Sequence, residues 1–192
     1  MPLHDGSPDI DYEVDAEIME LPYIFRTIVQ NIPYFHIASN HFHDKRKFKV
    51  GIVWKSGDWD MQRSIPFSLI SSITESRNIE LYILQRGNGL AERIDNIGIL
   101  SGSDDIYETA VVIKSLDLII SVDTMVAHLA GALAVPVWLL LNANPDWRWM
   151  INRSDSPWYP TMRIFRQARF GEWESVIQRV RQQFIKHYSI LN

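Results

Sequence analysis

Strand-like apolar runs alternate with helical patterns from Phe48 onward, and this alternation constrains the fold more than any other feature. The strand-like runs are 48–54, 79–84, 97–100, 118–122, 136–141 and 162–165. Helical spacing covers 66–74, 90–94, 106–116, 125–134 and the C-terminal stretch from Trp173. Strands that alternate with helices form βαβ crossovers, which place the strands in one parallel sheet. We therefore predict an α/β fold, a single Rossmann-like doubly wound sheet over residues 48–192.

Apolar spacing also predicts which residues form the core. Residues 118–122 (LIISV) are almost wholly apolar, as expected for a strand buried on both faces. One face of the helix over 106–116 should carry Ile106, Ala110, Ile113 and Leu116. The last helix has an apolar stripe of Trp173, Val176, Ile177, Val180 and Phe184.

Residues 1–47 lack this regularity. They are acidic at first, and the stretch 21–40 carries two prolines and shows no clean period. We interpret 1–47 as an irregular segment outside the Rossmann-like domain. We expect Met1–Asp11 to be poorly ordered, because little in its composition can be buried. Its polar, acidic character is unlike a signal peptide.

Composition excludes several classes of protein. The 192 residues are 46% hydrophobic and 22% charged, the profile of an ordinary globular chain. The net charge, 19 − 23 = −4, argues against a dedicated nucleic-acid binder, which needs a basic face. No apolar run reaches the roughly 20 residues of a membrane span, so we expect none. There is no cysteine, which excludes disulfides and thiolate metal sites and leaves the compartment open.

The turn over 121–131 (SVDTMVAHLAG) is the most informative one, because ligands bind outside the carboxyl ends of strands in such sheets. Asp123 and Thr124 stand where a helix begins, and either can cap it. Helix starts expose unpaired N–H groups that can hold a phosphate, and each hydrogen bond to a charged oxygen contributes about 1.5–3 kcal/mol. The alternative is that Asp123 only caps the helix and His128 is a half-buried histidine with satisfied hydrogen bonds.

A second turn, Lys55–Phe67, follows the first strand. Lys55 stands at the strand end, Gly57 permits a close backbone approach, and Arg63 precedes the next helix. Two cations near a helix start favour a second phosphate contact, although a solvated surface loop is the alternative. The turn matches neither the Walker phosphate loop nor the three-glycine dinucleotide fingerprint.

Two further regions carry weaker signals. The turn Gln85–Gly89, with Glu92 beyond it, follows the second strand, where nucleotide folds often contact a ribose or base. A plain surface turn is the interpretation that we favour there. Residues 145–167 interleave tryptophans and Tyr159 with arginines, which can stack on a base or lock a long loop to the sheet. We favour the structural role for most of them.

The residues do not support a metal site or a nucleophilic triad. His41, His43 and Asp44 form a short cluster, but no third ligand is spaced to join the two histidines. There is no Ser-His-Asp order and no nucleophile elbow. The catalytic residue, if there is one, stays unassigned, and we expect no metal or other cofactor.

Six blocks of sequence together carry a resemblance to a known family. They are GIVWKSGD with RSIP (51–66), LQRG (84–87), TAVVIKSLDLIISVDTMVAHLAGALAVPVW (109–138), PDWRWM (145–150), SPWYPTMRIFRQ (156–167) and GEWESVI (171–177). The stretch 48–184 resembles the C-terminal, nucleotide-sugar-binding half of glycosyltransferase family 9, the heptosyltransferase group. It is more similar still to the glycosyltransferase-like domains attached to tetratricopeptide repeats in bacterial proteins.

This resemblance implies a GT-B enzyme with two facing Rossmann-like domains, of which the second binds the donor. It implies that the donor diphosphate lies against Lys55, Ser56, Gly57, Arg63, Asp123, Thr124, Met125 and His128. It places the nucleoside near Gln85, Gly87 and Glu92. Inverting enzymes of this type need no metal, because helix N–H groups and cations stabilise the leaving diphosphate. We expect a cytoplasmic protein whose ligand is a nucleotide sugar.

The upstream residues depart from the family. Residues 11–37 resemble only the tail of the first domain, which binds the acceptor and supplies the general base. We therefore expect the chain to bind a donor but to lack the group that deprotonates an acceptor. An acceptor domain on a partner chain would complete inverting transfer. The alternative is a non-catalytic interaction or self-association module that uses the apolar face left by the missing domain. A nicotinamide-dependent oxidoreductase is disfavoured by the missing glycine fingerprint.

The phosphate hypothesis predicts the effect of two substitutions. Asp123→Ala and Lys55→Ala should each weaken diphosphate binding and leave the melting temperature nearly unchanged.

Overall fold

The computed structural model describes residues 33–34, 36–38, 47–57, 60–74, 79–94 and 96–189. The predicted disorder of Met1–Asp11 and the rejected metal cluster of His41, His43 and Asp44 lie outside these residues. None of the helices in the described ranges is both long and apolar enough to cross a membrane.

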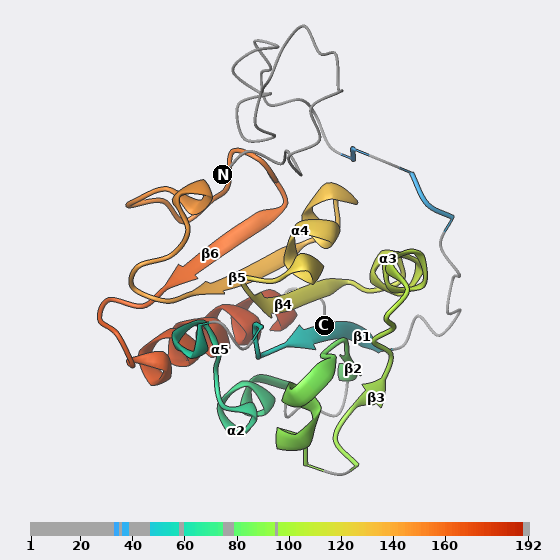
Figure 1. The fold of residues 1–192 in the computed structure, drawn as a ribbon, viewed down its shortest axis with the longest axis horizontal. Helices are drawn as coiled ribbons and strands as arrows, with labels where there is room; N and C mark the ends of the chain where they lie inside the picture. Colours follow the sequence, from blue (N-terminus) through green and yellow to red (C-terminus); the bar gives the residue numbers. More distant parts are fainter. Residues whose placement is uncertain are drawn as a thin grey trace, which may run out of the picture. The chain divides into compact units, whose positions relative to one another are not determined.

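The strands form one parallel sheet of six, which confirms the predicted fold class (Figure 1). They are β1 (Phe48–Val53), β2 (Ile79–Ile83), β3 (Ile99–Leu100), β4 (Leu118–Val122), β5 (Val137–Leu141) and β6 (Met162–Arg166). Their spatial order is β3-β2-β1-β4-β5-β6. The chain therefore builds outward from β1 in one direction, returns to β4, and builds outward in the other. Between the carboxyl ends of β1 and β4 the order reverses, which is where doubly wound sheets bind ligands.

Helices cover both faces of the sheet. They are α2 (Phe67–Ser71), α3 (Ile106–Lys114), α4 (Met125–Ala132) and α5 (Trp173–Ser189), with short 3-10 turns η2 (Met61–Arg63), η3 (Ser72–Thr74), η4 (Gly87–Glu92) and η5 (Trp147–Trp149). Helices α2 and α5 lie on one face of the sheet and α3 and α4 on the other (Figure 1). The side chains of α2 and α5 belong to one core cluster, and those of α3 and α4 to a second. Successive strand residues supply opposite clusters, as the period of two requires: Ile120 joins the first and Ile119 the second.

The predicted apolar stripe of α5 is buried along its whole length. All five of its members lie in the first core cluster: Trp173, Val176, Ile177, Val180 and Phe184. In α3 the prediction holds for Ala110 and Ile113 but is wrong for Ile106, which is 60% exposed. Ile106 opens the helix beyond the end of β3, so it does not lie over the face of the sheet. Thr109, one turn further on, takes a buried position in its place.

A short part of the upstream segment packs on the Rossmann-like domain. The N–H of Tyr34 donates to the carbonyl of Ala132 at 2.8 Å, at the last residue of α4. Ile37 packs against the core cluster beneath α3 and α4. Residues assigned to the irregular segment thus contact the side of the domain that carries α4.

The burial of α5 generates a stability prediction with an internal control. Ile177 is 4% exposed, whereas Ile185 on the same helix is 65% exposed. Ile177→Ala should lower the free energy of unfolding by about 2–5 kcal/mol, because it removes apolar contacts and leaves a cavity. Ile185→Ala should change it by less than about 0.5 kcal/mol. Urea unfolding followed by circular dichroism measures both, and equal effects would contradict the packing of α5.

Candidate functional site

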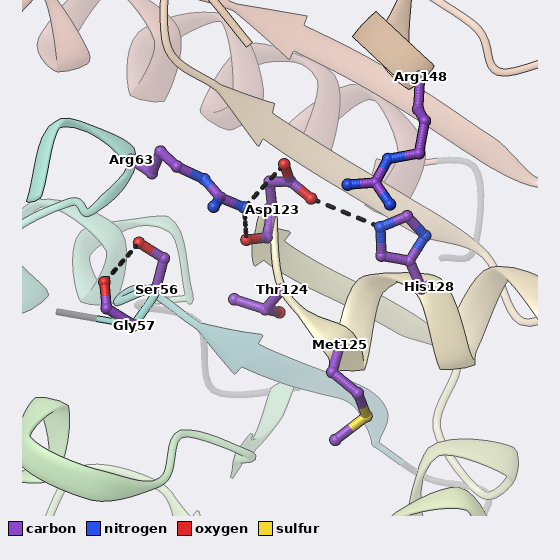
Figure 2. Close-up of a pocket in the computed structure, with 8 residues that line it drawn as sticks. All are labelled: Ser56, Gly57, Arg63, Asp123, Thr124, Met125, His128 and Arg148. Atoms are coloured by element: carbon purple, nitrogen blue, oxygen red, sulfur yellow. Dashed lines mark hydrogen bonds and ion pairs between the residues drawn. The ribbon is translucent and has the colours of Figure 1, made fainter. Parts of the chain in front are cut away.

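A polar cavity lies where the strand order reverses (Figure 2). Its volume is about 320 Å³, within the range of small-molecule sites. Its lining residues come from the connections after β1, β4 and β5: Ser56, Gly57, Arg63, Asp123, Thr124, Met125, His128 and Arg148. Seven of these eight residues were predicted to contact a diphosphate, and the structure brings all seven together at one cavity.

The carboxylate of Asp123 is the centre of the site. It is buried, and one of its oxygens lies 2.8 Å from Nη2 of Arg63, which also donates to the Asp123 carbonyl at 2.6 Å. The other oxygen lies 3.6 Å from Nε2 of His128 (Figure 2). Burial acts to raise the pKa of Asp123, but the nearby N–H groups of His128 and Trp149 and the charges of Arg63 and His128 outweigh it and lower that pKa. Asp123 is therefore ionised.

Trp149 places a buried indole N–H near the Asp123 carboxylate. Its side chain is 1% exposed, and its indole N–H meets no partner at full hydrogen-bond geometry within the described part of the chain. It nevertheless lies near enough to Asp123 to lower the pKa of that residue. The indole thus adds a buried N–H dipole beside the charge without completing a bond to it.

Helix α4 begins without a side-chain cap, which corrects the expectation that Asp123 or Thr124 caps it. Thr124 occupies the cap position, but its side chain accepts no backbone hydrogen bond. Its hydroxyl instead pairs with that of Ser121 at 3.0 Å, and Asp123 is engaged by Arg63. The N–H groups of Met125 and Val126 have no hydrogen-bond partner among the described residues. The cavity therefore meets unpaired N–H donors and the positive end of a helix dipole.

His128 is enclosed by aromatic rings. Its imidazole stacks on Trp149, with ring centroids 4.9 Å apart and an interplanar angle of 27°. Tyr159 meets it edge-on, and the Tyr159 hydroxyl lies 3.1 Å from Nδ1. Burial, and to a smaller extent Tyr34, raise the pKa of Tyr159, against a lowering effect of Arg148. His128 is thus a half-buried histidine that also lines the cavity, so the two interpretations of it are compatible.

Arg148 is the lining residue that the sequence did not assign to the site. Its Nε donates to Asp146 at 2.8 Å, and that hydrogen bond raises its pKa. Its terminal nitrogens have no partner among the described residues, and Figure 2 shows them turned toward His128. The sequence signal for Arg148 was an arginine among aromatic residues in the connection that follows a buried strand. We did not assign it to the site, because we favoured a structural role for most of the 145–167 region.

The other long side chains of that region hold the loop in place. Nη2 of Arg166 donates to the carbonyls of Trp149 (3.1 Å) and Met150 (2.8 Å), and burial lowers its pKa. The indole of Trp158 donates to the Arg148 carbonyl at 2.9 Å. Both side chains therefore fix the segment that carries Arg148 and Trp149.

Lys55 does not line the main cavity, and its Nζ pairs with Glu92 at 3.1 Å. It does line a smaller cavity of about 150 Å³ together with Thr124 and Met125 at the start of α4. It lines a neighbouring cavity of about 250 Å³, together with Gln85 and Gly87. That cavity shares Ser56 and Gly57 with the main one, so the two adjoin at these residues.

Gln85, predicted to contact a nucleoside, has its amide committed to the backbone. Its Oε1 accepts from the N–H groups of Trp54 (3.1 Å) and Lys55 (2.9 Å). Its Nε2 donates to the carbonyls of Lys55 (3.2 Å) and Arg86 (2.8 Å). Gln85 therefore joins the ends of β1 and β2. Gly87, with φ +66°, offers backbone to the neighbouring cavity, whereas Glu92 is not among the residues that line it.

Within the described ranges, no three histidine, aspartate or glutamate side chains are grouped so as to hold an ion.

A parallel sheet covered on both faces, with a polar cavity at its switch point, defines a Rossmann-like α/β domain. Its fold matches the crystal structure of a glycosyl transferase family 9 protein from Veillonella parvula DSM 2008, with a TM-score of 0.56 and 11% identity. The match covers 77% of this chain and 47% of that one. At this identity it establishes a shared fold, that of a domain from a GT-B glycosyltransferase.

The sequence comparisons add one relative. Protein FlbA of Caulobacter vibrioides is 28% identical over 145 residues, which are 69% of this chain and 24% of FlbA. No protein-family model matches the chain. The chain thus spans about a quarter of the length of FlbA and about half of the family 9 structure.

The Arg63 pairing revises the expectation that substituting Asp123 leaves stability unchanged. Asp123→Asn should lower the free energy of unfolding at neutral pH by about 1.5–3 kcal/mol, because Arg63 loses a charged acceptor.

The folded-state pKa of Asp123 lies below its usual 3.8. The stabilisation is therefore complete above that value and is lost as the pH falls through the folded pKa. Urea unfolding at pH 7, 5 and 3 should show a smaller gap between wild type and variant at pH 3 than at pH 7. A gap that does not change with pH would contradict the ion pair.

Proposed function

We propose that the cavity binds the diphosphate of a nucleotide-sugar donor, and that the chain is the donor-binding domain of a glycosyltransferase. The observation that carries this proposal is the uncapped start of α4, which faces a cavity lined by two arginines. Helix starts with free N–H groups are ready-made anion sites. The family 9 fold match supports the same class of ligand.

The charges of the cavity suit an anion with two phosphates. Arg63 balances the ionised carboxylate of Asp123, so that charge does not repel the ligand as an isolated one would. Arg148 is paired through Nε with Asp146, but its terminal nitrogens are available as donors to a charged oxygen, and the helix dipole contributes about half a positive charge. The adjoining cavity gives the nucleoside or the sugar a place to extend, past the backbone of Gly87.

The same groups would assist transfer of the sugar. As the bond from the anomeric carbon to the diphosphate breaks, negative charge grows on the leaving oxygen. Donors already aimed at that oxygen stabilise it without reorganisation, so we propose a leaving group held by N–H groups and arginines and not by a metal. Inverting transfer also needs a general base on the acceptor side. The cavity's carboxylate, Asp123, is committed to Arg63, so we propose that an acceptor domain or a partner chain supplies that base.

Arg148 provides the sharpest test, because the same loop contains a matched control. Arg148 and Arg153 each pair with an aspartate two residues away, but Arg153 is not among the residues that line the cavity. Arg148→Ala should weaken binding of a nucleoside diphosphate by about 10- to 100-fold, the loss of one or two bonds to a charged oxygen. Arg153→Ala should change it by less than about twofold. Isothermal titration with a panel of nucleoside diphosphates and their sugars measures both.

Two results would refute the proposal. Absence of binding heat from every member of the panel with the wild-type protein would remove the ligand class. Equal losses in the two arginine variants would show that binding does not use the cavity.

A second candidate function is that of an interaction module. Exposed apolar side chains at the carboxyl-end edge of the sheet favour it. Several large apolar side chains are exposed in the elements that begin after strand ends. They are Met61, Ile106, Tyr107, Met125 and Trp147, each between 50% and 63% exposed. Carboxyl-end connections of a parallel sheet share one edge, so these side chains belong to the same edge of the sheet as the cavity, which Met125 also lines. We propose self-association of the chain through this edge.

Self-association predicts a sedimentation behaviour that substitution changes. The weight-average mass of the wild-type protein should rise with concentration. Ile106→Ser combined with Tyr107→Ser should return the protein toward the monomer, because it removes two exposed apolar groups from this edge. Analytical ultracentrifugation over a hundredfold range of concentration measures this. A wild-type monomer at every concentration would exclude the second candidate and leave the first intact.

A further inference from the structure

A line of polar contacts runs from Asp123 through His128 to Tyr159. Nε2 of His128 lies 3.6 Å from Asp123, and its Nδ1 lies 3.1 Å from the Tyr159 hydroxyl. We propose that Tyr159 is a positioning residue, which fixes the tautomer and orientation of His128 so that Nε2–H is presented to an anionic ligand. The identity of the ligand in this inference rests on the proposed function. The effect of Tyr159 on the tautomer of His128 does not depend on any ligand.

The direction of the protons follows from the ionised state of Asp123. A carboxylate can only accept hydrogen bonds, so the nitrogen that faces it must carry a hydrogen. In the neutral imidazole, Nδ1 is then the acceptor and takes the proton of the Tyr159 hydroxyl. If His128 is protonated, the same hydroxyl accepts from Nδ1–H. Tyr159 therefore satisfies Nδ1 in either state and keeps Nε2 turned to the cavity.

The length of the contact with Asp123 leaves Nε2–H available. Ordinary N–H···O hydrogen bonds span 2.7–3.2 Å, whereas this pair is separated by 3.6 Å. The Asp123 carboxylate therefore orients Nε2–H of His128 but does not form a full hydrogen bond with it. A phosphate oxygen that enters between the start of α4 and Arg148 can take this hydrogen bond.

Tyr159 is held in place from two sides. A Cβ on Gly131 of α4 would lie 2.5 Å from Cγ of Tyr159, so the ring lies directly on the helix backbone. On another side its neighbour is the ring of Tyr34, at 6.1 Å between centroids, whose hydroxyl donates to the Trp158 carbonyl at 2.7 Å. A ring packed in this way can hold its hydroxyl at a fixed point.

His128 is surrounded by polar and aromatic groups from several elements. They are Asp123 at the end of β4, Arg148 and Trp149 of η5, and Tyr159 before β6, with Arg63 of η2 on the far side of the carboxylate. Among these, only Tyr159 has a hydroxyl that can act as both donor and acceptor at Nδ1.

Tyr159→Phe tests the inference, because it keeps the ring and removes the hydroxyl. Long-range proton–nitrogen NMR should show His128 as the Nε2–H tautomer in the wild type and as a mixture in the variant. Isothermal titration should show binding of a nucleoside diphosphate weakened by about 3- to 10-fold. In the His128→Ala background, Tyr159→Phe should have no further effect, because the two residues act as one unit. Tyr82→Phe, which removes a hydroxyl that donates to Glu80 and not to His128, is the matched control and should change neither measurement.

The outcomes separate the inference from the proposed function. An unchanged tautomer in Tyr159→Phe, or losses that add up in the double variant, would overturn the positioning role. If the wild type binds no nucleoside diphosphate, the proposed function fails, and the nitrogen shifts alone decide whether Tyr159 fixes His128. Gly131→Ala, which pushes the Tyr159 ring away, should shift the same nitrogen signals and serves if Tyr159→Phe does not fold.

Discussion

The ionised carboxylate of Asp123 is the constraint on which the site depends, because a buried charge is costly unless other groups compensate for it. Its partners come from three separate connections: Arg63 after β1, His128 in α4 and Trp149 after β5. The charge therefore ties together the loops that form the cavity. Helix α4 begins with free N–H groups because Thr124, which occupies the cap position, pairs its hydroxyl with that of Ser121 and does not cap the helix.

Local pattern was sufficient to predict most of the fold. The strand over 118–122 and the apolar stripe of the last helix match the structure, because burial on both faces or on one face imposes a period that a single segment displays. Ile106 fits the helical period of α3 and is still exposed, because periodicity does not record where a helix starts relative to the edge of its sheet. The presence of the helices could be predicted, but the burial of their first turns could not.

The site was predicted less completely, because its contacts join residues far apart in the chain. Lys55 and Arg63 are both cations of one turn and were equivalent in the sequence. Glu92, 37 residues from Lys55, draws that side chain away, whereas Arg63 meets Asp123 across 60 residues. Tyr159 contacts His128, which lies 31 residues earlier in the chain, and nothing in the sequence beyond its aromatic neighbours indicated this contact. A turn can indicate which residue types gather at a strand end, but the pairing among them is set by tertiary packing.

Departures from local rules gather around the cavity. Helix α4 lacks a side-chain cap, which costs about 1 kcal/mol, and the indole of Trp149 is buried without completing a hydrogen bond. Met150, directly after η5, has φ 53° and ψ −178°, a conformation that strongly favours glycine. Nη2 of Arg166 donates a hydrogen bond to the carbonyl of Met150, and this bond stabilises the strained loop. Stability alone would favour a capped helix and a relaxed loop. Both departures lie beside Arg148, at the cavity that we propose as the ligand site.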